Sequence, residues 1–118
     1  MQFASDTIYF DFDKSNVKSQ YNANVRVVAD YLKSHPSESV LIEGHCDERG
    51  TEEYNRALGE RRALSVRERL LALGVNTDQI ATISYGEEKP VAFGRTEADF
   101  AKNRRAEFVL LVGLEPAH

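Results

Sequence analysis

The sequence has a single cysteine, Cys46, so no disulfide bond can form within the chain. This leaves open the redox state of the compartment in which the protein works. No run of about eighteen apolar residues is available to span a membrane, and the first residues lack the basic head and apolar stretch of an export signal. The residues given therefore predict a soluble protein, either cytoplasmic or exported with its signal removed.

An excess of positive charge is also missing. The chain has 15 lysines and arginines against 19 acidic residues, a formal net charge of −4. Nonspecific nucleic-acid binding depends on a basic surface, so this balance argues against a nucleic-acid partner. The run Asn103-Arg104-Arg105 does not change this, because Glu97 and Glu107 dilute its charge. A structural ion pair is the favoured interpretation of that run.

The length and the 42% hydrophobic content predict one domain over residues 1–118, with a core at about 7–112 and a disordered tail at 113–118. Alternating apolar residues indicate strands, and apolar spacing of three to four residues indicates helices. The expected elements are a strand at 8–12, a helix from Ser19 to Pro36, a strand at 40–43, a helix from Thr51 to Gly74, a strand at 81–85, a short helix after a capping box at 96–99 and a strand at 106–112.

This order predicts an α+β domain of βαβαβ(α)β type, with a mixed four-stranded sheet in one layer and helices packed against it in a second. The last strand, 106–112, has apolar residues on both faces. We therefore expect it to be an inner strand of the sheet.

An arginine interrupts the apolar face of the second helix. At 100° per residue, Arg62 falls in the middle of a single stripe. The other members of the stripe are Asn55, Leu58, Val66, Leu70 and Leu73. Because arginine cannot shed its charge, a buried Arg62 needs an anion. A carboxylate such as Asp47 or Asp13 supplies that anion, or a ligand brings it.

Asp47 and Asp13 are the candidate carboxylates because each follows a strand. Asp47 ends the second strand just before a helix, where free backbone N–H groups favour negative charge. Asp13 ends the first strand and is expected at the same sheet edge, near Arg62. Two simpler interpretations remain open: Arg62 and Asp47 form a structural pair, or Asp13 only shapes its turn.

The sequence gives little support for a catalytic site or a metal-binding site. Neighbours in an extended segment point to opposite faces, so His45 and Cys46 are badly placed to share a proton. No second cysteine and no paired histidines with metal-ligand spacing are available. Packing against the sheet is the favoured role of both residues. We therefore expect a protein that is not an enzyme and has no cofactor.

Five separated motifs, taken together, resemble those of OmpA-like peptidoglycan-binding domains, and within that family those of the lipoprotein branch. The resemblance covers about residues 7–111. The motifs are Tyr9-Phe10-Asp11-Phe12-Asp13, Glu43-Gly44-His45-x-Asp47-Glu48-Arg49-Gly50-Thr51, Tyr54-Asn55-x-x-Leu58-Gly59-x-x-Arg62-Ala63-x-x-Val66, Ser84-Tyr85-Gly86-Glu87-Glu88-Lys89-Pro90 and Asn103-Arg104-Arg105.

The resemblance implies a non-catalytic module that binds the diaminopimelate of the peptidoglycan stem peptide. By position, Arg62 is expected to bind the free carboxylate of diaminopimelate through its guanidinium. Asp47 is expected to bind the same carboxylate, partly through its backbone N–H. Further positions of this sequence match residues that line the pocket in the family. They are Phe12, Asp13, Glu48, Arg49, Thr51, Asn55 and Leu58.

The resemblance also implies a place on the periplasmic side of the outer membrane, tethering that membrane to the cell wall. The lipid anchor belongs to an N-terminal cysteine outside this chain, and the implied partners are Tol proteins, especially TolB. A protein-protein adaptor whose main ligand is such a partner is the alternative. Gly59 stands where many members have serine, which favours the lipoprotein branch, and Cys46 stands where alanine or threonine is more usual.

Overall fold

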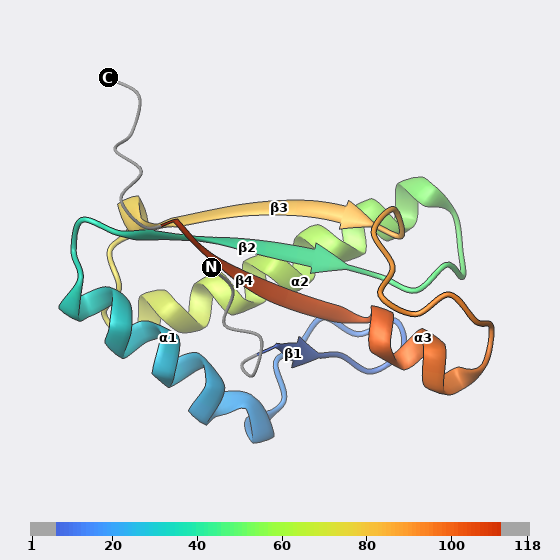
Figure 1. Ribbon diagram of the computed structural model, residues 1–118, viewed down its shortest axis with the longest axis horizontal. Coiled ribbons are helices and arrows are strands. Elements are labelled where there is room, and N and C mark those ends of the chain that lie inside the picture. The colour runs from blue at the N-terminus through green and yellow to red at the C-terminus, as the bar shows by residue number, and fades with distance from the viewer. Residues whose placement is uncertain (1–6, 112–118) are drawn as a thin grey trace.

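The computed structural model describes residues 7–111, which form one sheet with helices beside it (Figure 1). Two short 3-10 turns, Ser19–Tyr21 and Thr77–Gln79, precede α1 and β3. The helices and strands are β1 (Ile8–Tyr9), α1 (Asn22–Ser34), β2 (Ser39–His45), α2 (Glu52–Ala72), β3 (Ile80–Gly86), α3 (Glu97–Asn103) and β4 (Arg105–Leu111). Across this described part of the chain, no helix combines the length and the apolar character needed to cross a membrane.

The sheet has the strand order β1-β4-β2-β3. Strands β2 and β3 are parallel and are joined through α2, whereas β4 runs antiparallel to both β1 and β2. The predicted mixed four-stranded sheet and the inner position of the last strand are both confirmed. Because β1 and β2 run in the same direction, the loops that follow them leave the sheet at one edge.

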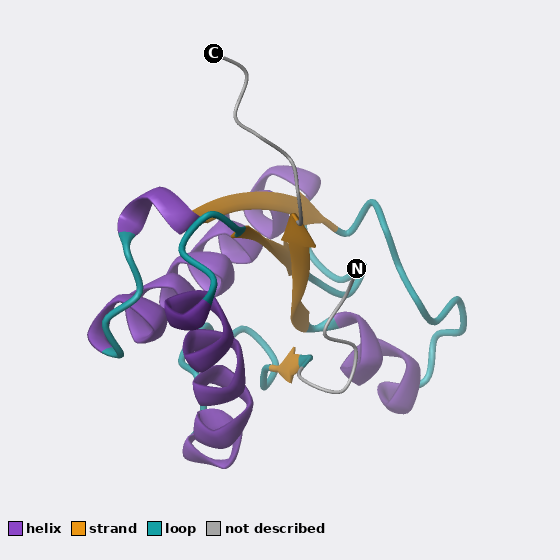
Figure 2. Cartoon of the chain, turned by 60° about the vertical axis from the view of Figure 1, so that its left-hand side comes forward, coloured by secondary structure: helices purple, strands orange, loops and turns teal. Residues whose placement is uncertain are grey.

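Helices α1 and α2 lie on one side of the sheet (Figure 2). Their apolar faces and the facing side chains of β2 and β4 form the core, as the helical and alternating patterns predict. The core includes Val25, Val28 and Leu32 of α1, Val66 and Leu70 of α2, and Val40, Ile42, Phe108 and Leu110 of the sheet.

Two expected boundaries are wrong. The first strand ends at Tyr9 rather than at residue 12, and the loop beyond it is held by Arg62, which binds the carbonyl groups of Asp11 and Lys14. Ser19 does not cap α1, since it begins a 3-10 turn and the helix starts three residues later. Local pattern could not foresee a loop shaped by a side chain from another helix.

Other predicted helix ends are confirmed. The side chain of Thr51 accepts a hydrogen bond from the backbone N–H of Tyr54, and Gly74 follows α2 with φ of 96°. Thr96 and Asp99 form the expected capping box at the start of α3. Val112 and the tail at 113–118 lie outside the described residues.

Two glycines let α2 touch β2 backbone to backbone. A Cβ atom on Gly44 of β2 would overlap the carbonyl oxygen of Gly59 in α2. A Cβ atom on Gly59 would meet the side-chain oxygen of Ser84 and would lie 3.0 Å from the carbonyl oxygen of Gly44. Strand and helix therefore approach more closely than any side chain allows, which brings Arg62, one turn further along α2, against the end of β2.

His45 ends β2 with a buried side chain. Its Nε2 lies 3.3 Å from a carboxylate oxygen of Glu43, and its ring stacks on Tyr85. Nδ1 has no hydrogen-bond partner within residues 7–111. Burial, followed by the positive charges of Arg105 and Lys89, lowers the pKa of His45 to about 3. The imidazole is therefore neutral and structural, which agrees with the packing role expected for it.

Replacing Gly44 by alanine tests the helix-strand contact. We expect Gly44→Ala to lower the free energy of unfolding by about 3 kcal/mol, since the added methyl group meets rigid backbone. Gly59→Ala is the matched comparison and should cost less, because its nearest neighbour is a side chain. Urea denaturation followed by circular dichroism measures both. A Gly44→Ala protein as stable as wild type would contradict the contact.

The buried His45 predicts loss of stability in acid. The unfolded chain binds a proton near pH 6.5, whereas folded His45 does so only near pH 3. The contribution of neutral His45 to the free energy of unfolding is therefore fully present above pH 6.5. It decreases as the pH falls toward 3, because protons then bind the unfolded chain in preference. We expect it to account for about 2 kcal/mol of the stability lost between pH 7 and pH 5. Denaturation curves should show a weaker pH dependence of stability for His45→Gln than for wild type.

Candidate functional site

A cavity of about 240 Å³ opens at the sheet edge where the loops after β1 and β2 meet the start of α2. The first loop forms one wall, the second loop forms another, and the first three turns of α2 complete it. The cavity is lined by Phe12, Asp13, Cys46, Asp47, Arg49, Gly50, Tyr54, Asn55, Leu58 and Arg62. Sequence segments more than thirty positions apart therefore contribute to one site, as the common edge of β1 and β2 predicts.

Arg62 is fully buried at this cavity. Its Nε donates to the carbonyl oxygen of Lys14 at 2.8 Å, Nη1 to that of His45 at 2.9 Å and Nη2 to that of Asp11 at 3.2 Å. The guanidinium also lies over the ring of Phe10, 5.2 Å from its centroid. One side chain of α2 thus holds the end of β2 and both sides of the loop after β1.

Every one of these bonds goes to a neutral carbonyl group. Among residues 7–111, no carboxylate forms an ion pair with Arg62, so of the two alternatives the structure does not contain the one in which Asp47 or Asp13 supplies the anion. Backbone carbonyls can solvate a guanidinium but cannot neutralise it. The three bonds use three of its five N–H groups and leave one on each Nη atom.

Asp47 is bound by other arginines. The backbone N–H and Nε of Arg49 donate to one carboxylate oxygen, and Nη2 of Arg49 donates to the other. Arg104 lies 3.6 Å from the second oxygen. Burial alone would raise the pKa of Asp47, but the hydrogen bonds of Arg49 and the charges of Arg49 and Arg104 outweigh it and hold that pKa below its usual value. The carboxylate of Asp47 is therefore ionised and already bound.

Asp13 and Tyr54 meet across the cavity mouth. Asp13 has φ of 59°, a conformation rare for residues other than glycine, and its carboxylate accepts a hydrogen bond from the Tyr54 hydroxyl. This contact raises the pKa of Tyr54. Beside them, Phe12 is 54% exposed although it is apolar. The mouth thus has a carboxylate, a hydroxyl and an aromatic ring.

Two predicted residues lie outside the cavity. Glu48 points to a neighbouring hollow and lies 3.6 Å from Arg95, and Thr51 caps α2. Glu48 lies in a bend after β2, and that bend turns its side chain toward Arg95 rather than into the cavity. The predicted residues that do line the cavity are Phe12, Asp13, Asp47, Arg49, Asn55, Leu58 and Arg62.

Tyr54, Gly50 and Cys46 line the cavity without having been predicted as site residues. The position of Tyr54 beside Asn55 at the start of α2 was a usable signal. Cys46 has no reactive character, since burial raises the pKa of its thiol to about 11 and its Sγ–H donates to the carbonyl of Asn55. In the described part of the chain, no histidine, cysteine and carboxylate cluster is suited to a metal ion.

The basic run that leads into β4, Asn103-Arg104-Arg105, is structural, as predicted. Asn103 holds the preceding loop by hydrogen bonds to the backbone of Val91 and Ala92. Arg104 pairs with Glu97, and Arg105 donates to the carbonyl of Lys89. Both arginines are buried, so they do not form an exposed basic surface.

Comparison with known proteins extends these findings. The OmpA family matches residues 9–104. The chain is 48% identical over 106 residues to the peptidoglycan-associated lipoprotein of Pasteurella multocida, covering 90% of this chain and 71% of that protein. It is 51% identical over 100 residues to the same-named protein of Legionella pneumophila, covering 85% of this chain and 57% of that one. It thus spans between about half and three quarters of these relatives' lengths. The expectation that the chain is not an enzyme agrees with their names.

The fold agrees with a solved structure as well. The crystal structure of the peptidoglycan-associated lipoprotein from Burkholderia pseudomallei superposes with a TM-score of 0.87 at 53% identity, over 88% of each chain. The α+β architecture predicted from the sequence is therefore that of a known relative. On the extent of the sequence match and the likeness of the fold, the chain belongs to the OmpA family.

Proposed function

We propose that this domain binds peptidoglycan without catalysis, by holding the free amino-acid end of diaminopimelate in the cavity beside Arg62. The observation that carries the proposal is a fully buried guanidinium, at the wall of a cavity, whose hydrogen bonds within residues 7–111 all go to carbonyl groups. Such a cation has high affinity for a carboxylate, which can form two charge-assisted hydrogen bonds with it. The names of the relatives support peptidoglycan as the source of that carboxylate.

The ligand carboxylate takes the two N–H groups of Arg62 that have no hydrogen-bond partner within residues 7–111. The backbone N–H of Asp47 adds a further donor, while its side chain stays with Arg49 and Arg104. Asp47 therefore contributes its backbone N–H to the site, while its carboxylate orders the loop by binding Arg49 and Arg104. Its carboxylate does not bind the ligand directly.

The ammonium group and the methylene chain of the diaminopimelate end are also matched by groups at the cavity. The ammonium group lies best at the mouth, where the carboxylate of Asp13 carries the opposite charge. The methylene chain packs against Phe12 and Leu58. A cavity of about 240 Å³ is smaller than the roughly 300 Å³ at which pockets begin to enclose drug-sized ligands. It accepts one end of a side chain, and the rest of the peptide stays outside.

In the cell, we propose that such binding tethers the outer membrane to the wall from its periplasmic side. The lipid anchor then belongs to residues outside this chain, and TolB and other Tol proteins are the proposed partners. This part rests on the motifs shared with OmpA-like lipoproteins, from Tyr9-Phe10 to Asn103-Arg104. Few apolar contacts are available to a flexible peptide, so we expect reversible binding of modest affinity.

The free carboxylate is the test of ligand identity. We expect calorimetry to detect binding of the tripeptide L-Ala-γ-D-Glu-meso-diaminopimelate, and at least tenfold weaker binding when L-lysine replaces diaminopimelate. Lysine lacks the second carboxylate, so the charge of Arg62 would stay unpaired. Equal affinity for both tripeptides would contradict the proposal. Failure to bind either, together with capture of a Tol protein, would favour the adaptor alternative.

Arg62→Lys tests the role of the guanidinium while keeping its charge. A single ammonium cannot serve three carbonyls and a ligand at once, so we expect roughly tenfold or greater loss of affinity for the diaminopimelate tripeptide. We also expect a lower melting temperature, because the loop after β1 loses its anchor. Arg67→Lys, on the outer side of α2, is the control and should change neither quantity. Unchanged affinity in folded Arg62→Lys would exclude Arg62 as the ligand-binding residue.

A further inference from the structure

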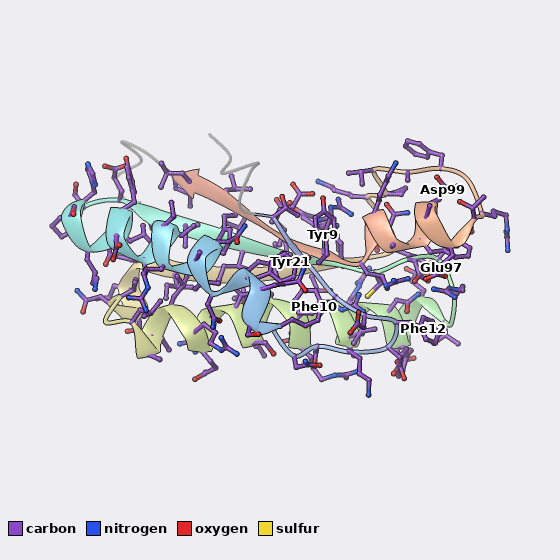
Figure 3. The ribbon with its side chains drawn as sticks, turned by 90° about the horizontal axis from the view of Figure 1, so that it is seen from below. Tyr9, Phe10, Phe12, Tyr21, Glu97 and Asp99 are labelled. Atoms are coloured by element: carbon purple, nitrogen blue, oxygen red, sulfur yellow. The ribbon has the colours of Figure 1, made fainter. Side chains whose placement is uncertain are left out.

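Helix α3 contributes no residue to the lining of the cavity, yet it contacts a residue that does. The guanidinium carbon of Arg49 lies 4.2 Å from the ring centroid of Phe12 and 4.4 Å from that of Phe100 in α3. Figure 3 shows Glu97 of α3 and Phe12 at the same end of the molecule. Arg49 is therefore stacked between a ring at the cavity mouth and a ring from α3.

The edge of the same guanidinium meets carboxylates. Nη2 of Arg49 lies 2.9 Å from Asp47 and 3.6 Å from Glu97. Nη1 of Arg104 lies 3.1 Å from Glu97 and 3.6 Å from Asp47. Each carboxylate thus touches both arginines, and the four groups form a ring of alternating charge. Glu97, at the start of α3, closes this ring.

We propose that α3 sets the affinity of the cavity for its ligand, with Glu97 and Phe100 as positioning residues that act through Arg49. Glu97 holds the guanidinium by its edge and Phe100 holds it by one face. The ring of Phe12 then packs on the other face of the Arg49 guanidinium. The remaining edge of the guanidinium donates hydrogen bonds to Asp47. The inference rests on the proposed function, since it concerns the affinity of that same cavity.

The physical reason is preorganisation. Phe12 is 54% exposed on a loop, and a free arginine side chain has many rotamers. If the ligand had to order both, the lost conformational entropy would reduce its affinity. The stack and the charge ring order them before the ligand arrives. Phe100 is buried, and Glu97 extends from the capped start of α3 with its side chain 67% exposed, so α3 offers the guanidinium one fixed face and one ion pair at the surface.

The experiment measures the affinity of the diaminopimelate tripeptide by calorimetry for Glu97→Gln, Phe100→Leu and Phe100→Tyr. In parallel, the Arg49 Nε–H signal is followed by ¹H–¹⁵N NMR, since flanking rings and a bond to Asp47 shift it and slow its exchange. We expect roughly threefold to tenfold weaker binding for Glu97→Gln and Phe100→Leu, with the signal moving toward that of a free arginine. Phe100→Tyr keeps the aromatic ring, so its affinity for the tripeptide and its Arg49 Nε–H signal should both match those of wild type. Glu60→Gln, which removes an exposed carboxylate elsewhere on α2, is the charge control.

The outcomes separate this inference from the proposed function. If wild type binds the tripeptide and the Arg49 signal moves in the α3 variants without any loss of affinity, the role of α3 is wrong and the proposed function stands. Loss of affinity with an unmoved Arg49 signal would also overturn it, because Arg49 would not be the link. If wild type does not bind the tripeptide, both fall together. Melting temperatures near that of wild type would show that the variants are folded during the measurement.

Discussion

The structure depends on one buried positive charge. Arg62 lies in the apolar stripe of α2 and is held by carbonyl groups of Asp11, Lys14 and His45. These carbonyls belong to the loop after β1 and to the end of β2, so a single side chain fixes the two segments that form the cavity walls. The close approach of α2 to β2, which Gly44 and Gly59 permit, makes this reach possible.

The same constraint is the basis for proposing that the cavity binds an anion. A guanidinium bound to carbonyls is solvated but not neutralised, and Asp47 is occupied by Arg49 and Arg104. Scaffold and binding site were alternatives when only the sequence was considered. In the structure Arg62 serves the scaffold with three of its N–H groups and keeps two for the proposed ligand.

The charges around the cavity are arranged in two layers. The inner layer is Arg62 with its carbonyls, and the outer layer is the ring of Asp47, Arg49, Glu97 and Arg104. Because every cation of the outer layer is matched by a carboxylate, that layer does not compete for an anion. It gives the loop before α2 a fixed shape, and the aromatic stack on Arg49 extends that order to Phe12.

The sequence by itself determined the order of elements, the mixed sheet with an inner last strand, the caps of α2 and α3, and the presence of Arg62 on a buried helical stripe. Periodicity and capping are local properties, so local patterns predict them. Only the tertiary structure decided what Arg62 binds, that Asp47 belongs to Arg49, and that Glu48 faces away from the cavity. Partner choice among charged groups depends on distances of a few ångströms between segments far apart in the chain. For the same reason, a short first strand ended early where a side chain of α2 bound its loop.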